Sequence, residues 1–311
     1  LFPYTTLFRS HYPTFDKEVS TALHIRRAGD ISGQQLGQYM LETMRPLGAQ
    51  FQQAKVVGLA KADRFAVEVL ADGVRQTIRA DIIVNAAGPF AAQVAAMHGE
   101  RLPIVNVLQQ KIAFADRNRA VDRKMPFAID LDGQTLAWSD DERAELAAAP
   151  EFARLLAPMP GSIHCRPDGG DHGEWIKLGW AFNEEQITAP VREPELNSYF
   201  PEVVLRAASR LQPRLAQYLA ALPRDRVHYG GYYPMTKENW PLIGAAKTPG
   251  VFLATALSGY GTMGACATGD LCACAVVGAP VPAFARSLSL ARYDDKALMD
   301  QLAASESRGL L

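Results

Sequence analysis

Side chains that can bind a small organic molecule stand at two places in this 311-residue chain. Tyr232 and Tyr233 precede a Pro-Met-Thr turn, and His164 and Arg166 lie two apart in a stretch that favours a β-strand. Aromatic walls attract an amine, whereas an imidazole and a guanidinium can bind an acidic group. In extended backbone only one tyrosine would face a cavity, and the basic pair would share a face. Packed tyrosines and a solvated basic pair are the simpler alternatives.

A third group would bind a ligand through the backbone. The apolar run at 251–257 ends in Ser258-Gly259-Tyr260-Gly261, and a helix of small residues follows. Glycine adopts φ > 0 and has no Cβ to hold a ligand away, and a helix start presents unpaired N–H groups at the positive end of its dipole. A flat or anionic ligand fits this pattern.

Composition limits the classes of function. The chain is 48% hydrophobic and 21% charged, with a net charge of −1, which is typical of a globular protein. It has no basic excess, so we expect no nucleic-acid binding, and no apolar run of about 20 residues, so we expect no membrane span. The six histidines lack metal-site spacing, so we expect no metal. Three of four cysteines share one helix, which favours free thiols and a cytoplasmic location.

The first ten residues, Leu1–Ser10, lack the features of a signal peptide. Their sequence is the one that a common short-read sequencing adapter encodes in frame. We therefore expect this segment to be an assembly artefact and the chain to begin in the middle of a longer protein.

Local patterns predict the elements of the first hundred residues. Ser32 is placed to cap a helix that ends near Gly48. Extended segments follow, with a hairpin turn at Asp72-Gly73. Residues 81–89 read as a buried strand that runs into a small-residue turn, Ala86-Ala87-Gly88.

Between residues 102 and 227 prolines become frequent. Strands are expected at 163–166 and 175–182, a short helix after Ser139, and a helix over 203–222 despite Pro213. A mixed sheet with helices on one face would result.

The segment from Tyr233 to Gly244, followed by the 258–261 elbow, resembles the C-terminal signature of the D-amino-acid oxidase superfamily of FAD-dependent oxidoreductases. The turn at 86–88 resembles that family's middle motif. The resemblance covers residues 22–278 and lacks the family's opening GxGxxG turn. It implies an α/β fold: a partial FAD-binding Rossmann-like domain without its N-terminal βαβ unit (11–101 and 228–285), an inserted α+β substrate-binding domain (102–227) and a C-terminal tail (286–311).

The resemblance also implies FAD as cofactor and oxidation of an amine or amino acid to an imine by hydride transfer to the flavin, with oxygen or another acceptor completing the cycle. The isoalloxazine and ribityl side would be lined by Ser258, Gly259, Tyr260, Gly261, Thr262 and Met263. The adenine half would meet Ala86, Ala87, Gly88 and the backbone of Val56.

The substrate position departs from part of the family. Tyr233 stands where glycine oxidase and D-amino-acid oxidase carry a carboxylate-binding arginine, and sarcosine oxidase has a tyrosine there. Gly231 stands where sarcosine oxidase has the cysteine that bonds the flavin. Lys111 would either lie near the flavin or be solvated. The alternatives are a flavin-fold binding or assembly protein without turnover and a dehydrogenase that reduces a quinone.

Overall fold

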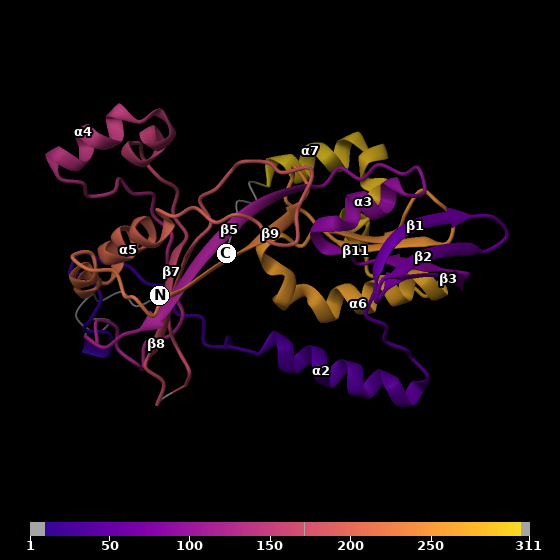
Figure 1. Ribbon diagram of the computed structural model, residues 1–311, viewed down its shortest axis with the longest axis horizontal. Coiled ribbons are helices and arrows are strands. Elements are labelled where there is room, and N and C mark those ends of the chain that lie inside the picture. Colours follow the sequence, from indigo (N-terminus) through magenta and orange to yellow (C-terminus); the bar gives the residue numbers. More distant parts are fainter. Residues whose placement is uncertain (1–9, 171, 306–311) are drawn as a thin grey trace.

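The structure is a computed structural model that describes residues 10–170 and 172–305, which form three β-sheets with helices around them (Figure 1). The predicted artefact at Leu1–Ser10 therefore lies outside the described residues except for Ser10. Two long strands, β5 (Val105–Ala115) and β9 (Val227–Met235), extend from one end of the molecule toward the other.

The first sheet is an antiparallel meander of β1 (Lys55–Lys61), β2 (Phe65–Ala71) and β3 (Val74–Ala80). Asp72 and Gly73 join β2 to β3 with φ of 48° and 78°. Two positive φ values match the right-handed twist of the paired strands, so the predicted hairpin turn is confirmed. Phe65 and Leu59 pack with Val251 of the neighbouring sheet and attach the meander to it.

The second sheet has the order β10-β11-β4, with β4 at Ile83–Asn85, β10 at Leu242–Ala245 and β11 at Val251–Thr255. β11 is antiparallel to β10 and parallel to β4, where Leu253 lies opposite Asn85. The helix α6 (Gly261–Val277) packs on β10 and β11.

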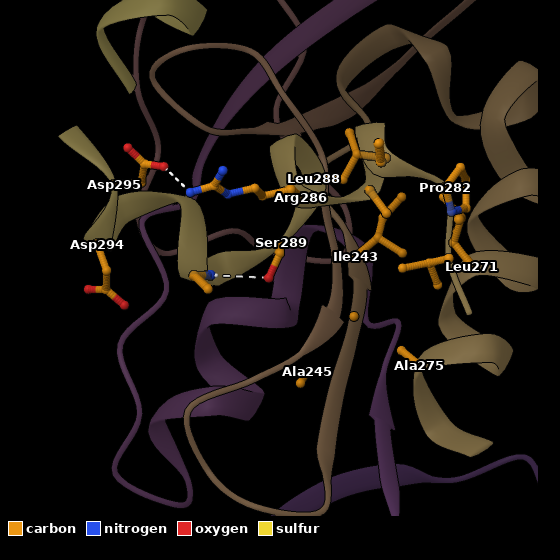
Figure 2. A pocket seen from close by; sticks show the side chains of 15 residues that line it. Ile243, Ala245, Leu271, Ala275, Pro282, Arg286, Leu288, Ser289, Asp294 and Asp295 are labelled. Atoms are coloured by element: carbon orange, nitrogen blue, oxygen red, sulfur yellow. Dashed lines mark hydrogen bonds and ion pairs between the residues drawn. The ribbon is translucent and has the colours of Figure 1, made fainter. Parts of the chain in front are cut away.

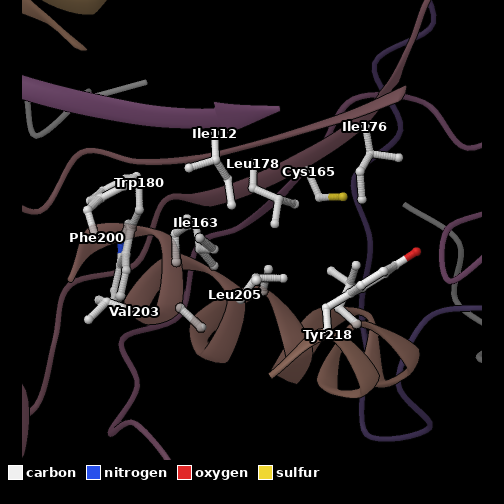
Figure 3. Packing of buried hydrophobic residues seen from close by; sticks show 14 of the residues in the cluster. Ile112, Ile163, Cys165, Ile176, Leu178, Trp180, Phe200, Val203, Leu205 and Tyr218 are labelled. Carbon is white, nitrogen blue, oxygen red and sulfur yellow. The ribbon is translucent and has the colours of Figure 1, made fainter. Parts of the chain in front are cut away.

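The third sheet has the order β6-β7-β8-β5-β9, and every neighbouring pair is antiparallel, so the expected mixed sheet is wrong. Its remaining strands are β6 (Ala128–Asp130), β7 (Ile163–Asp168) and β8 (Trp175–Trp180). Ile112, Ile163 and Leu178 line one face and pack on α5 (Phe200–Leu211), as Figure 3 shows. Helix α4 (Asp140–Ala148) has the predicted capping box on Ser139.

Three expected boundaries differ from the structure. β9 hydrogen-bonds to β5 from Val227 to Met235, so a boundary at residue 228 cuts through a strand of the third sheet. Helix α5 ends at Leu211 rather than 222, because Pro213 has no N–H to donate, and the short helix η4 (Pro213–Tyr218) follows. The expected C-terminal tail folds as η6 (Ala283–Leu288), η7 (Leu290–Asp294) and α7 (Lys296–Ala304).

Helix α2 (Gly33–Met44) is capped as predicted, because Ser32 Oγ accepts a hydrogen bond from Gln35 N at 3.2 Å. Gly48, after the short helix η1 (Arg45–Leu47), has φ +90° and ends the segment. No residue of α2 is buried, and Tyr39 and Met44 are 68% and 44% exposed. Its apolar side thus has no packing partner in the described part of the chain. No helix there is long and apolar enough to cross a membrane.

A buried ion pair joins the C-terminal segment to the β9–β10 connection. Arg292 is 1% exposed, and its Nε lies 2.8 Å from Glu238 Oε1. The guanidinium also donates to Trp240 O at 3.0 Å, and the Tyr293 hydroxyl donates to Glu238 at 2.7 Å. Burial opposes ionisation of Glu238, but the Tyr293 and Arg292 hydrogen bonds outweigh it and lower the pKa of that carboxyl. The turn that follows Tyr233 is therefore fixed by Arg292 of the C-terminal segment.

We expect Arg292→Met to lower the free energy of unfolding by about 3–5 kcal/mol, because it leaves the Glu238 carboxylate buried without its cation. Arg286→Met is the matched control, since Arg286 pairs with Asp295 but its side chain is 72% exposed. Its loss should cost less than about 1 kcal/mol. Urea unfolding followed by circular dichroism measures both, and equal losses would contradict the assignment.

Candidate functional site

The two glycine-containing turns meet because the strands that lead into them are parallel neighbours. β4 leads into the short helix η2 (Gly88–Phe90), and β11 leads into η5 (Ser258–Tyr260). The carboxyl ends of parallel strands open at the same edge of a sheet, which is where α/β proteins bind ligands. β9 contacts both η2 and η5, so the strand that carries Tyr233 reaches this edge as well.

The backbone at the end of β11 is strained. Ala256 and Ser258 have φ of +60° and +53°, a region in which residues with a Cβ are uncommon. Each such residue costs on the order of 1–3 kcal/mol and persists where its surroundings require it. The hydroxyl oxygens of Thr255 and Ser258 are buried and lack a hydrogen-bond partner in the described part of the chain. Unsatisfied oxygens beside strained backbone indicate a binding site.

Helix α6 begins directly after this turn and has no side-chain cap at its N-terminus. Its first residue is Gly261, and a Cβ built there would meet no atom within 4 Å. Space therefore lies next to N–H groups that carry the positive end of the helix dipole. Thr262 and Met263 follow in the first turn and are exposed.

Most of the cofactor-binding residues predicted from the sequence lie at this sheet edge, and one lies in the first sheet. Ala86, Ala87 and Gly88 follow β4 at this edge, and the residues from Ser258 to Met263 follow β11. Val56 lies in β1, in the separate meander, at a bulge between Val56 and Gly58. Its strand contacts α3 (Ala91–Ala96), the helix that follows the turn at 86–88.

The strand register gives the third sheet one polar face opposite the face that α5 covers. Lys111 lies opposite both Tyr229 on β9 and Gly179 on β8, and Gly179 lies opposite His164 on β7. Alternation along the strands adds Tyr233, Lys177, Arg166 and Asp168 to the same face. We call these seven side chains the polar face: Lys111, His164, Arg166, Asp168, Lys177, Tyr229 and Tyr233.

The two tyrosines point to opposite faces. Tyr233 belongs to the polar face, whereas Tyr232 lies on the other side, where its hydroxyl accepts a hydrogen bond from Val191 N at 3.3 Å. Burial, followed by the neighbouring Tyr229, raises the pKa of Tyr233 to about 12. Its hydroxyl is therefore protonated at neutral pH and remains able to donate a proton in a hydrogen bond.

His164 is buried on the polar face, with 3% exposure. Its Nδ1 lies 3.3 Å from Ser162 O, which assigns the proton to Nδ1. A Cβ at Gly179 would come within 2.3 Å of His164 Nε2 and 2.9 Å of Lys111 Cγ, so both side chains lie against the bare glycine. Burial, then the charges of Lys111 and Arg166, lowers the pKa of His164 to about 4. The ring is neutral at pH 7.

Lys177 and Arg166 lie side by side on the polar face, which the sequence alone did not predict. Lys177 pairs with Asp168 at 3.0 Å, and Arg166 contacts Asp30 at 2.5 Å and Asp168 at 3.6 Å. Burial, then Arg166 and Lys177, lowers the pKa of Lys111. The alternation of side chains along the strand expected at 175–182 could have placed Lys177 on one face of the sheet. Only the pairing of β8 with β7 shows that it lies beside Arg166.

A separate hollow lies away from this sheet edge. It has a volume of about 600 Å³ and opens between β10, α6 and η6, with Ile243, Leu271 and Leu288 in its wall (Figure 2). None of the residues that line it is a predicted site residue. No group of histidine, cysteine or carboxylate side chains within residues 10–170 and 172–305 is arranged to hold a metal ion.

The depressed pKa of His164 predicts a pH-dependent stability. The unfolded state takes up a proton near pH 6.5 and the folded state only near pH 4, so the stabilisation is complete above pH 6.5 and is lost as the pH falls toward 4. The loss should amount to roughly 3 kcal/mol.

We expect His164→Gln to remove this contribution, so that its unfolding free energy falls less between pH 6.5 and 4 than that of the parent protein. The exposed His24→Gln is the control and should retain the parent profile. Denaturant unfolding at several pH values measures the difference, and parallel profiles for His164→Gln and the parent would contradict the prediction.

Known proteins resemble this chain over most of its length. A family model described as FAD dependent oxidoreductase matches residues 6–275. D-amino acid dehydrogenase 3 of Mesorhizobium japonicum is 27% identical over 218 residues, which cover 70% of this chain and 42% of that protein. This chain therefore spans about two fifths of the length of that curated relative.

Solved structures share the fold at low sequence identity. Glycine oxidase from Geobacillus kaustophilus superposes with a TM-score of 0.65 at 16% identity, covering 93% of this chain and 65% of that one. L-Proline dehydrogenase from P. horikoshii also gives 0.65 at 16% identity, covering 93% and 67%. An L-α-glycerophosphate oxidase from Mycoplasma pneumoniae, solved with FAD bound, gives 0.64 at 12% identity, covering 88% and 63%.

Proposed function

The chain belongs to the FAD-dependent oxidoreductase family, and on that basis we propose that it forms part of an enzyme that oxidises a C–N bond of an amine or amino acid to an imine. FAD, when bound, supplies the hydride acceptor for such a reaction. The protein's own residues would bind the cofactor, orient the substrate and control protonation beside it.

The observation that carries the proposal is the shared edge of β4 and β11. Strained backbone at Ala256 and Ser258, unpaired oxygens on Thr255 and Ser258, and open space at Gly261 before an uncapped helix all lie along one strand end. A flat ring system with several acceptor atoms and a negative charge fits these features, and FAD has them.

The residues that would hold FAD follow from this edge. The turn from Ser258 to Gly261, with Thr262 and Met263, would lie along the isoalloxazine and ribityl part. The turn from Ala86 to Gly88 would lie near the adenine half. The backbone of Val56 would contact the adenine ring.

The polar face would form the substrate side. β9 reaches both turns, and its Tyr233 hydroxyl stays protonated, so it can donate a hydrogen bond to a substrate while its ring offers an apolar wall. Neutral His164 and charged Arg166 would orient polar groups of the substrate. Tyr232 would support the loop at Val191 rather than touch the substrate.

Relatives support an amine or amino acid as the substrate class. Their names include a D-amino acid dehydrogenase, a glycine oxidase and an L-proline dehydrogenase. The acceptor that completes the cycle would be oxygen or another oxidant. Turnover measured with and without oxygen separates these two cases.

We expect the full gene product that contains this chain to purify yellow, with FAD held noncovalently. Gly261→Val should abolish flavin retention, because a β-branched side chain would fill the space next to the helix N-terminus. Cys272→Ala is the control, since this buried thiol packs beside Ile243 and Leu271. Flavin absorbance per protein measures both, and equal occupancy in the two variants would place the cofactor elsewhere.

Tyr233 predicts the substrate preference. Without an arginine at this position a charge-assisted contact is missing, which is worth roughly 1.5–3 kcal/mol, or about ten- to a hundredfold in binding. We expect glycine and D-alanine to be poor substrates compared with sarcosine, other N-methylated amino acids or bulkier amines. Anaerobic flavin bleaching by such a panel tests this, and fastest bleaching by glycine or D-alanine would refute it.

A further inference from the structure

Lys111 is a half-buried cation on the polar face. Within residues 10–170 and 172–305 its ammonium group makes no ion pair or hydrogen bond, although Arg166 and Lys177 act on it from the same face. A charge held away from water is costly unless an opposite charge or hydrogen bonds compensate it. The lowered pKa of this lysine reflects that cost.

The charges on the polar face do not balance. Among the residues that the structure describes, three cations, Lys111, Arg166 and Lys177, meet two carboxylates, Asp168 of the same strand as Arg166 and Asp30. Asp168 satisfies Lys177 at 3.0 Å and lies 3.6 Å from Arg166. Within the described part of the chain this leaves Lys111 without an ion-pair partner, and the neighbouring Arg166 guanidinium is paired with the distant Asp30.

That distant carboxylate comes from an irregular segment. Asp30 precedes α2, its side chain is 68% exposed, and it contacts Arg166 at 2.5 Å. The Arg166 side chain is mostly buried, but the Asp30 carboxylate faces water, so solvent can replace its contact and a competing anion can displace it from the guanidinium. Asp30 thus marks where an oxyanion binds the guanidinium.

Gly179 makes room for such an anion between two cationic side chains. Because it has no side chain, the His164 ring and the Lys111 stem lie together over it. Arg166 is next to His164 in the alternation of β7, and Tyr229 lies opposite Lys111 on β9. An ammonium and a guanidinium therefore converge around one neutral imidazole.

We propose that Lys111 and Arg166, beside the neutral His164 ring, form an anion-binding subsite that receives an acidic side-chain group of the substrate and that Asp30 competes for it. This inference rests on the proposed function for the identity of the ligand as a substrate. It assigns the substrate class as an amine or amino acid that carries a further acidic group, apart from any carboxylate next to its amine.

The subsite itself is tested without turnover, by equilibrium dialysis of radiolabelled sulfate at fixed ionic strength. We expect one sulfate per chain, at least tenfold weaker binding by Lys111→Met, and several-fold tighter binding by Asp30→Asn. Lys55→Met, which removes an exposed lysine on β1, is the matched control and should bind as the parent does. Absent sulfate binding, or unchanged affinity in both Lys111→Met and Asp30→Asn, overturns the subsite.

The substrate assignment is tested with the full gene product loaded with FAD, using N-methyl-D-aspartate and N-methyl-D-asparagine, which differ only in that the side-chain carboxylate is replaced by a neutral amide. The acidic compound should bleach the flavin about tenfold more efficiently, and Lys111→Met should remove that preference. Sulfate binding without such a preference overturns the substrate class and leaves the subsite. Sulfate binding without bleaching by any amine would instead show that the proposed oxidation is wrong.

Discussion

The parallel pairing of β11 with β4 is the constraint on which the candidate site depends. Only three residue pairs form it, from Val251 opposite Ile83 to Leu253 opposite Asn85, yet it places two distant turns at one sheet edge. Parallel neighbours need a long crossover connection, and here that connection contains the whole antiparallel sheet from β5 to β9. The same connection returns β9 to both turns, so the proposed substrate-side residues and the two proposed ligand-binding turns are brought together by one topological step.

Structural features at this edge oppose stability unless something binds there. The positive φ values of Ala256 and Ser258 and the unpaired hydroxyls of Thr255 and Ser258 each cost free energy. The surroundings that hold them are rigid: Leu253 and Ala256 belong to a buried cluster, and Arg292 fixes the β9–β10 connection nearby. A ligand that hydrogen-bonds to these hydroxyls would offset part of that free-energy cost when it binds, which is how a preorganised site gains affinity.

Local chemistry made much of this predictable. The caps at Ser32 and Ser139 and the Asp72-Gly73 turn depend on neighbours within four residues, and all three formed as expected. The resemblance to the flavin family was also local, since it rested on two short motifs. Strand pairing was not local: the antiparallel order of the third sheet, the extent of β9, and the meeting of Lys111 with Lys177 are set by contacts between distant segments. Pro213 was visible in the sequence, but its effect depended on whether the helix could continue past it.

Gly179 has a consequence for reading mutational data. It offers no functional atom, yet any side chain at this position would displace the His164 ring or the Lys111 stem. A saturation screen would therefore score position 179 among the most intolerant of the sheet, and a search for reactive side chains would pass over it. Replacing the glycine would therefore move an imidazole and an ammonium together without changing either residue. Library design that aims to change specificity gains a single site that controls two neighbours at once.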